Sequence, residues 1–163
     1  MIRTLALAGG MAGALALSQF PEFSQQYLQR LSGALDELRP LVLSLDGVAR
    51  VSGLDRAEAL DRIGGNPVAD EMRGRLSAAA LRYDRLAADA ETLRRAGPVE
   101  RLALPWRFRD TDILRASLAD FRPALPLTPA GLICAGIGFA GGWLAVALPL
   151  GALRRVLFGR RAA

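Results

Sequence analysis

The distribution of charge most constrains what this chain can fold into. Residues 4–21 and 123–153 form two runs of 18 and 31 residues without a charged side chain. Every Asp and Glu lies in the segment 22–122, where 16 carboxylates are balanced by 16 arginines. The other five arginines lie outside the two runs and account for the net charge of +5. A water-soluble fold gives no reason for this sorting, whereas a chain that crosses a membrane twice does.

Each uncharged run is long enough for a membrane-spanning helix. Eighteen helical residues rise about 27 Å, close to the ~30 Å hydrocarbon core of a bilayer. In the second run, Thr128 and Pro129 are typical of a helix start, and Pro149 predicts a kink or an end. We therefore predict an all-α fold with a transmembrane helix over 1–21, a helical domain over 22–122, a second transmembrane helix over 123–153 and a basic tail over 154–163.

The arginines that flank the runs predict the orientation. Loops rich in basic residues stay in the cytoplasm, so both termini are expected there and the helical domain in the periplasm. Arginines beside a span also attract anionic lipid head groups. This role is predicted for four residues of the tail: Arg154, Arg155, Arg160 and Arg161.

The first run has a second interpretation, as a cleaved secretory signal. Arg3 gives it a basic head, and Ala14-Leu15-Ala16 is an acceptable cleavage motif. The small-residue face that contains Gly9, Gly10 and Gly13 is unusual for a simple signal. We expect the segment to be retained as a span, and cleavage stays the open alternative.

Small residues recur every four positions in both runs, for example at Gly9 and Gly13 and at Gly138 and Gly142. Such faces let helix backbones approach closely where lipid supplies no hydrophobic driving force. We predict helix packing through five glycines: Gly9, Gly10, Gly13, Gly138 and Gly142. The alternative is the general glycine content of membrane helices. The sequence does not show whether the contact forms within one chain or between chains.

The segment between the runs is predicted to form helices whose apolar residues alternate in steps of three and four. The first such seam comprises Leu28, Leu31, Leu35, Leu38, Val42 and Leu45, and the second comprises Leu76, Ala79, Tyr83, Leu86, Ala90 and Leu93. Two matching seams on helices joined by turns predict an antiparallel helical hairpin or a small bundle.

Local signals place the helix ends in this segment. Pro40 predicts a bend or a break, and Ser52 with Asp55 resembles a capping box that opens a helix through residue 63. Asn66 before Pro67 predicts the start of a long helix, which the pair at 97–98 ends. The stretch 102–109, whose aromatic and arginine residues fall at 106–109, suits either the membrane interface or a loop against the bundle.

No catalytic, cofactor or metal site is predicted. The chain has no histidine, all 21 basic residues are Arg, and Cys134 is the single cysteine. The G-x-G-x-x-G at 136–141 lies in an apolar run without a preceding strand, so it is not taken as a dinucleotide site. Asp110 and Asp112 fit a helix N-terminus better than a cation site. No arginine stripe with interleaved aromatics indicates nucleic-acid binding.

The segment from Leu17 resembles the start of a bacterial inner-membrane family known as domain of unknown function 2937. The resemblance rests on a hydrophobic N-terminus followed by Gln-x-Tyr-x-Gln-Arg-Leu-x-Gly at positions 25–33. It implies a location and an architecture but no activity. The polar residues of the motif suit either a partner contact or hydrogen bonds at the base of the bundle; they are Gln25, Tyr27, Gln29 and Arg30.

These features predict a non-enzymatic accessory or scaffold subunit of a larger inner-membrane complex. Its partners would be membrane lipids and other subunits, or further copies of itself. A self-assembling envelope protein that shapes or spaces the membrane is the alternative from a different class. A lipid-binding carrier, with a pocket between bundle and bilayer, is a weaker alternative.

Overall fold

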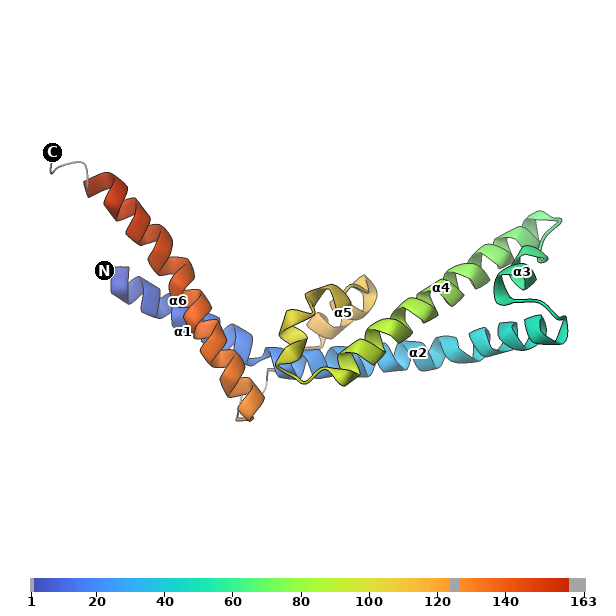
Figure 1. Ribbon diagram of the computed structural model, residues 1–163, viewed down its shortest axis with the longest axis horizontal. Coiled ribbons are helices and arrows are strands. Elements are labelled where there is room, and N and C mark those ends of the chain that lie inside the picture. The colour runs from blue at the N-terminus through green and yellow to red at the C-terminus, as the bar shows by residue number, and fades with distance from the viewer. Residues whose placement is uncertain (1, 124–126, 159–163) are drawn as a thin grey trace. The chain divides into compact units, whose positions relative to one another are not determined.

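The computed structural model describes residues 2–123 and 127–158, with side chains up to residue 154, and every regular element in these ranges is helical (Figure 1). The helices are α1 (Ile2–Ser18), α2 (Phe20–Val51), α3 (Arg56–Asp61), α4 (Pro67–Arg95), α5 (Thr111–Ala119) and α6 (Pro129–Phe158). Two short 3₁₀ helices, η1 (Glu100–Ala103) and η2 (Pro105–Arg107), lie between α4 and α5. The prediction of an all-α fold is confirmed.

The chain divides into two compact units. The terminal unit comprises the described residues of 1–26, 96–105 and 118–163, and the hairpin unit comprises residues 27–95 and 106–117. Helices α2 and α5 each contribute residues to both units.

In the terminal unit, α1 and α6 pack against each other in antiparallel directions. Gly9 lies opposite Gly142 and Val146, whereas Gly13 lies opposite Gly138, so the register runs in opposite senses along the two helices. The amino end of α1 and the carboxyl end of α6 accordingly lie at the same end of the pair (Figure 1).

The bounds of α6 differ from the predicted second span. Thr128 caps the helix through its hydroxyl, which accepts a hydrogen bond of 3.1 Å from the Gly131 N–H, and Pro129 is the first helical residue. The helix therefore starts at 129, as Thr128 and Pro129 predict, inside the segment 123–153. It continues through Pro149 to Phe158, so the predicted end at Pro149 is wrong. Residues 154–158, which were predicted to begin the basic tail, belong to α6.

In the hairpin unit, α2 and α4 are antiparallel and α3 closes one end of the pair. Val42 and Leu45 of α2 form a buried cluster with Leu60 of α3 and Ala80 of α4. Toward the other end, the Arg94 guanidinium donates a hydrogen bond of 2.8 Å to the Ser32 hydroxyl. Helix α2 runs unbroken through Pro40, which excludes the predicted break there.

The predicted seams supply most of the core of the hairpin unit. On α2 the fully or nearly fully buried members are Leu28, Leu31, Leu35, Val42 and Leu45, and on α4 they are Leu86, Ala90 and Leu93. The remaining seam residues are partly buried: Leu38, Leu76, Ala79 and Tyr83. Burial of these apolar side chains stabilises the helices, which are too polar elsewhere to persist alone.

The turn between α2 and α3 corrects the predicted capping box. Gly53 has φ +68°, and the Leu54 N–H donates to the Ala49 carbonyl at 2.9 Å, so Ser52 belongs to the carboxyl end of α2. Asp55 is the N-cap of α3, and it forms the reciprocal box with Glu58. At the next start, the Asn66 side chain accepts hydrogen bonds from two backbone N–H groups of α4, as predicted.

Candidate functional site

The five glycines predicted to pack helices all lie in the contact between α1 and α6. A Cβ added at Gly13 would collide with the Gly138 carbonyl oxygen, and one added at Gly142 would collide with the Gly9 carbonyl oxygen. A Cβ at Gly10 would stand 2.8 Å from the Phe139 ring. The backbones therefore meet at a distance that only glycine allows, and the contact forms within a single chain.

Three other glycines of α6 take no part in this contact. A Cβ added at Gly136, Gly141 or Gly151 would meet no atom within 4 Å. Gly136 and Gly141 belong to the G-x-G-x-x-G sequence of α6, and they stand in open space on a helix. These positions serve as matched controls for substitutions at Gly138 and Gly142.

The outward surface of the α1–α6 pair is apolar. Exposed large apolar side chains on α6 include Leu132, Ile133, Ile137, Trp143, Leu144 and Leu148, and those on α1 include Leu5, Leu7, Met11 and Leu15. Within the described residues, one helix is long and apolar enough to cross a membrane, over Pro129–Arg154. Helix α1 has 17 residues and rises about 26 Å, slightly less than the ~30 Å hydrocarbon core, so the two-span prediction is supported for one span only.

Of the tail arginines predicted to meet lipid head groups, Arg154 lies in α6 and is exposed. The side chain of Arg155 lies outside the described residues, as do Arg160 and Arg161 altogether.

The terminal unit contains a buried arginine in η1, next to the beginning of α2. Arg101 of η1 is 6% exposed and donates hydrogen bonds to the Ser24 hydroxyl at 3.3 Å and to the Gln25 amide oxygen at 3.4 Å. Burial lowers the pKa of Arg101 from its ordinary value. Nearby, the Phe23 and Phe121 rings meet edge to face, with centroids 5.9 Å apart. Gln25 of the family motif thus has an internal partner.

Tyr27 is a core residue of the hairpin unit, so its predicted role in contacting a partner is wrong. It is fully buried, and its ring packs against the Phe108 ring with centroids 4.8 Å apart. Burial raises the pKa of Tyr27, and a backbone hydrogen bond from Asp110 opposes this shift. Its helical neighbours Gln29 and Arg30 are exposed, and their part in a partner contact stays a prediction.

A buried carboxylate on α4 holds the segment that follows η1. Asp89 is 1% exposed and accepts hydrogen bonds of 2.9 Å from Arg107 and 2.8 Å from Arg109. Together with the contact of Phe108, these bonds place residues 107–109 against the bundle, and Trp106 stays 60% exposed. Of the two interpretations of residues 106–109, a loop packed on the bundle describes all but the tryptophan.

Asp110 joins two elements of the hairpin unit. Its carboxylate caps α5 by accepting a hydrogen bond of 3.1 Å from the Ile113 N–H, as predicted, and it pairs with Arg82 of α4 at 3.2 Å. Burial raises the pKa of Asp110, but the bonds from Ile113 and Arg82 outweigh it, and the net shift is downward.

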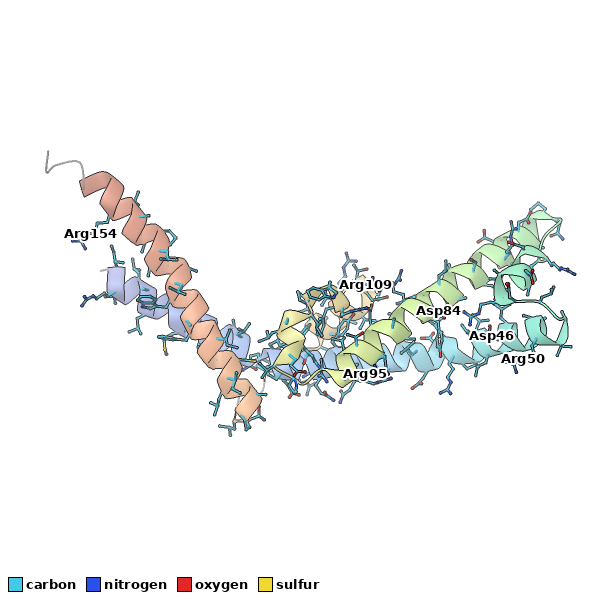
Figure 2. All side chains as sticks on the ribbon, in the orientation of Figure 1. Asp46, Arg50, Asp84, Arg95, Arg109 and Arg154 are labelled. Atoms are coloured by element: carbon cyan, nitrogen blue, oxygen red, sulfur yellow. The ribbon has the colours of Figure 1, made fainter. Side chains whose placement is uncertain are left out.

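Three charged residues connect the three helices at the closed end of the hairpin. Arg56 of α3 donates to Asp46 of α2 at 2.6 Å and to Asp84 of α4 at 2.9 Å. The two aspartates are labelled in Figure 2. The hydrogen bond from Arg56 lowers the pKa of Asp46, and the same bond raises the pKa of Arg56. This arrangement holds the three helices together at the closed end of the hairpin.

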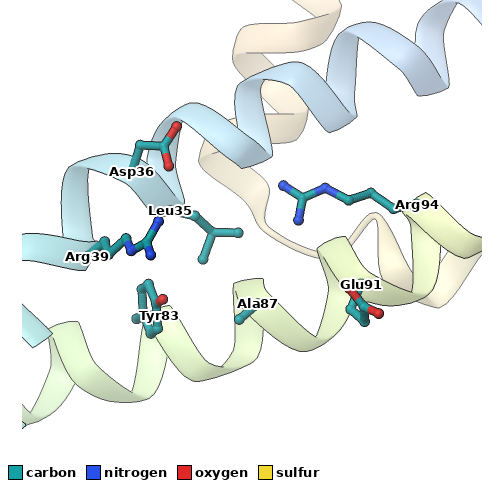
Figure 3. Close-up of a pocket in the computed structure, with 7 residues that line it drawn as sticks. All are labelled: Leu35, Asp36, Arg39, Tyr83, Ala87, Glu91 and Arg94. Atoms are coloured by element: carbon teal, nitrogen blue, oxygen red, sulfur yellow. The ribbon is translucent and has the colours of Figure 1, made fainter. Parts of the chain in front are cut away.

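A groove of about 390 Å³ lies between α2 and α4 (Figure 3). Leu35 and Ala87 form its apolar part, and the guanidinium groups of Arg39 and Arg94 reach into it from either side of Leu35. The other lining residues are Asp36, Tyr83 and Glu91. Neither arginine forms an ion pair with another described residue. Sequence analysis did not single out Arg39 or Arg94, although both flank seam positions.

The comparison with protein families gives one match, which spans nearly the whole chain. Residues 1–159 match the family described as "protein of unknown function (DUF2937)", and the chain belongs to this family. No curated protein and no solved structure matches the chain. Across the described residues, no group of three or more His, Cys, Asp or Glu side chains could hold a metal ion.

Proposed function

We propose that this chain, a member of that family, is a non-enzymatic accessory or scaffold subunit of a bacterial inner-membrane complex. The proposal places α1 and α6 in the bilayer, both termini in the cytoplasm and the hairpin unit in the periplasm. The observation that carries it is the glycine contact between two apolar helices whose outer faces remain apolar. Close backbone approach is how helices associate where lipid, and not water, surrounds them.

The intrachain contact changes which surface can receive a partner. The small-residue faces of α1 and α6 are already occupied by each other, so they are not free to dock against a foreign helix. In this proposal the membrane-embedded contact holds the subunit together. The partner then binds outside the bilayer.

We assign the partner contact to the groove between α2 and α4. Arginine and tyrosine are the residue types that most often dominate protein interfaces, and the groove offers Arg39, Arg94 and Tyr83 around an apolar floor. Neither arginine has a carboxylate partner among the described residues, so each can pair with an acidic side chain of a partner segment, while Asp36 and Glu91 of the same groove can pair with a basic one.

Native mass measurement after gentle detergent extraction tests the proposal. A foreign subunit at fixed stoichiometry is expected, and Arg39→Glu with Arg94→Glu should release it. Arg50→Glu with Arg62→Glu, at two exposed positions outside the groove, makes the same change in charge, should retain it and serves as the control. A ring of identical chains would favour the self-assembling alternative, and a lone monomer would refute both.

The topology has a separate test. Leu81 is 67% exposed in the hairpin unit, so Leu81→Cys should react with a membrane-impermeant thiol reagent added from the periplasmic side. A cysteine in place of Arg160 should react only after the membrane is opened. Labelling of both positions from the same side would contradict the proposed orientation.

A further inference from the structure

An apolar groove of about 250 Å³ lies within the terminal unit where α1 gives way to α2. Ala16 and Leu17 of α1 line one wall, Phe20 and Phe23 of α2 continue it, and Leu118 and Phe121 form the opposite wall. The α-helix is interrupted at Gln19, between Ser18 and Phe20, and this break opens the groove.

The lining determines what the groove can bind. Among the described residues that line the groove, Gln19 alone has a polar side chain, so a ligand that needs several hydrogen bonds has few partners here. Pockets that enclose a whole drug-sized molecule usually measure roughly 300–1,000 Å³. At about 250 Å³ the groove takes only part of a ligand, and its apolar walls favour a hydrocarbon chain.

The position of the groove identifies the source of that chain. Its walls continue from the apolar outer face of α1, where Leu15 is 67% exposed, and Leu118 at the opposite wall is 58% exposed. If α1 lies in the bilayer, the groove opens where acyl chains end and head groups begin. A hydrocarbon chain there is supplied by the membrane itself.

A charged group beside the groove suits the head group of such a lipid. Arg122 directly follows Phe121, is exposed, and forms no ion pair with another described residue. A guanidinium binds phosphate through paired hydrogen bonds. One molecule with an apolar tail and an anionic head therefore satisfies both features.

We propose that this groove binds one acyl chain of a membrane phospholipid, with the lipid phosphate held by Arg122. The inference rests on the proposed membrane location of α1. It adds a structural lipid to the scaffold, at the junction between the apolar helix pair and the rest of the terminal unit.

The test uses the full-length protein expressed in bacterial membranes, extracted in mild detergent and weighed by native mass spectrometry with fragmentation of any retained lipid. The wild type should retain one phospholipid per chain. Ala16→Phe fills the groove and should lower the retained fraction about tenfold. Ala12→Phe lies one turn earlier on the same exposed helix face, does not line the groove, and should retain the lipid.

Two further variants separate lipid loss from misfolding. Leu118→Asp places a charge at an exposed position of the groove wall, and it should lose the lipid while keeping the wild-type circular dichroism. Arg122→Gln should keep a lipid but lower the preference for phosphatidylglycerol over phosphatidylethanolamine roughly two- to fivefold. Equal retention by Ala16→Phe, Leu118→Asp and Ala12→Phe would overturn the inference, as would a wild type without lipid.

Carbonate extraction of the same membranes keeps the two proposals apart. If the wild type is released from the membrane by alkaline carbonate, the proposed function fails. If it stays in the membrane and retains no lipid in detergent, the lipid site alone fails.

Discussion

The terminal unit and the hairpin unit both contain an antiparallel helix pair, and the two pairs are built from opposite residue types. Glycines form the contact between α1 and α6, whereas leucines with two alanines, a valine and a tyrosine form the seams of α2 and α4. In water, burial of large apolar side chains drives helix association. In lipid that gain is absent, so helices associate through close backbone packing. The chemistry of each contact thus indicates the solvent in which it forms.

The largest effect is expected from Gly138→Leu, because its side chain would occupy the space of the α1 backbone. The two helices should separate and expose Cys134, which is fully buried one turn earlier on α6. We expect maleimide labelling of Cys134 in detergent to become at least about tenfold faster. Gly141→Leu, which meets open space, should leave labelling slow. Equal labelling rates in the two variants would contradict the claim that glycine packing holds α1 and α6 together.

The corresponding change in the hairpin unit is Leu86→Ala, since Leu86 is 1% exposed. Removing this side chain should lower the free energy of unfolding of the hairpin unit by about 3 kcal/mol. Leu81→Ala, on the exposed side of the same helix, should change it by less than about 0.5 kcal/mol. Urea titrations followed by circular dichroism measure both. A large loss for Leu81→Ala would instead mark that face as buried in an assembly.

A somewhat smaller loss is expected from Asp89→Ala. It removes the shared acceptor of Arg107 and Arg109, whose side chains are partly exposed and can regain water. We expect a cost of about 2 kcal/mol, less than the 3–5 kcal/mol typical when a fully buried partner is stranded. Asp84→Ala should cost at most about 1 kcal/mol, since the Asp84 side chain is 56% exposed. The same urea titrations measure the free energy of unfolding of both variants. Equal losses would show that the burial of Asp89 does not strengthen its ion pairs.

The smallest expected effect is the dependence of hairpin stability on pH. The pKa values of Asp46 and Asp110 are lowered in the folded protein, so their contribution is present above about pH 4 and is lost as the pH falls further. With no histidine, stability should stay flat between about pH 5 and 8. Melting temperatures of the hairpin unit, measured from below pH 4 up to pH 8, test both the acid-induced loss and the flat region. Asp46→Asn should weaken the acid-induced loss, and a steep change near pH 6.5 would contradict the assignment.

Local signals allowed most helix starts to be predicted from the sequence. Asn66 and Thr128 each cap the helix that follows because a short polar side chain can satisfy the first free N–H groups wherever it occurs. The prediction of Ser52 as an N-cap was wrong because the chain turns at Gly53, which has a positive φ. Ser52 therefore follows the end of α2, and Asp55 is the N-cap of α3. Pro40 and Pro149 break neither helix, since the neighbouring hydrogen bonds continue past the missing N–H.

The contacts between distant segments could be predicted only in part. The glycine spacing on α1 predicts a packing face, but the same spacing would serve a partner chain equally well. Tyr27 lies among polar residues, which hides its burial in the sequence. Asp89 was not predicted as a core residue, yet it lies three residues after Leu86 and next to Ala90, on the side of α4 that faces the core. A carboxylate that falls at the three- or four-residue spacing of a buried apolar seam is the sequence signal that would have identified Asp89 as buried.

The antiparallel register of α1 and α6 has a consequence for the connectivity of the protein. The beginning of α1 and the end of α6 lie at the same end of the pair, so a short peptide could join them without disturbing a helix. A circularly permuted chain, opened instead at the exposed Gly64–Gly65 turn, would then keep every contact described above while reading its helices in a new order.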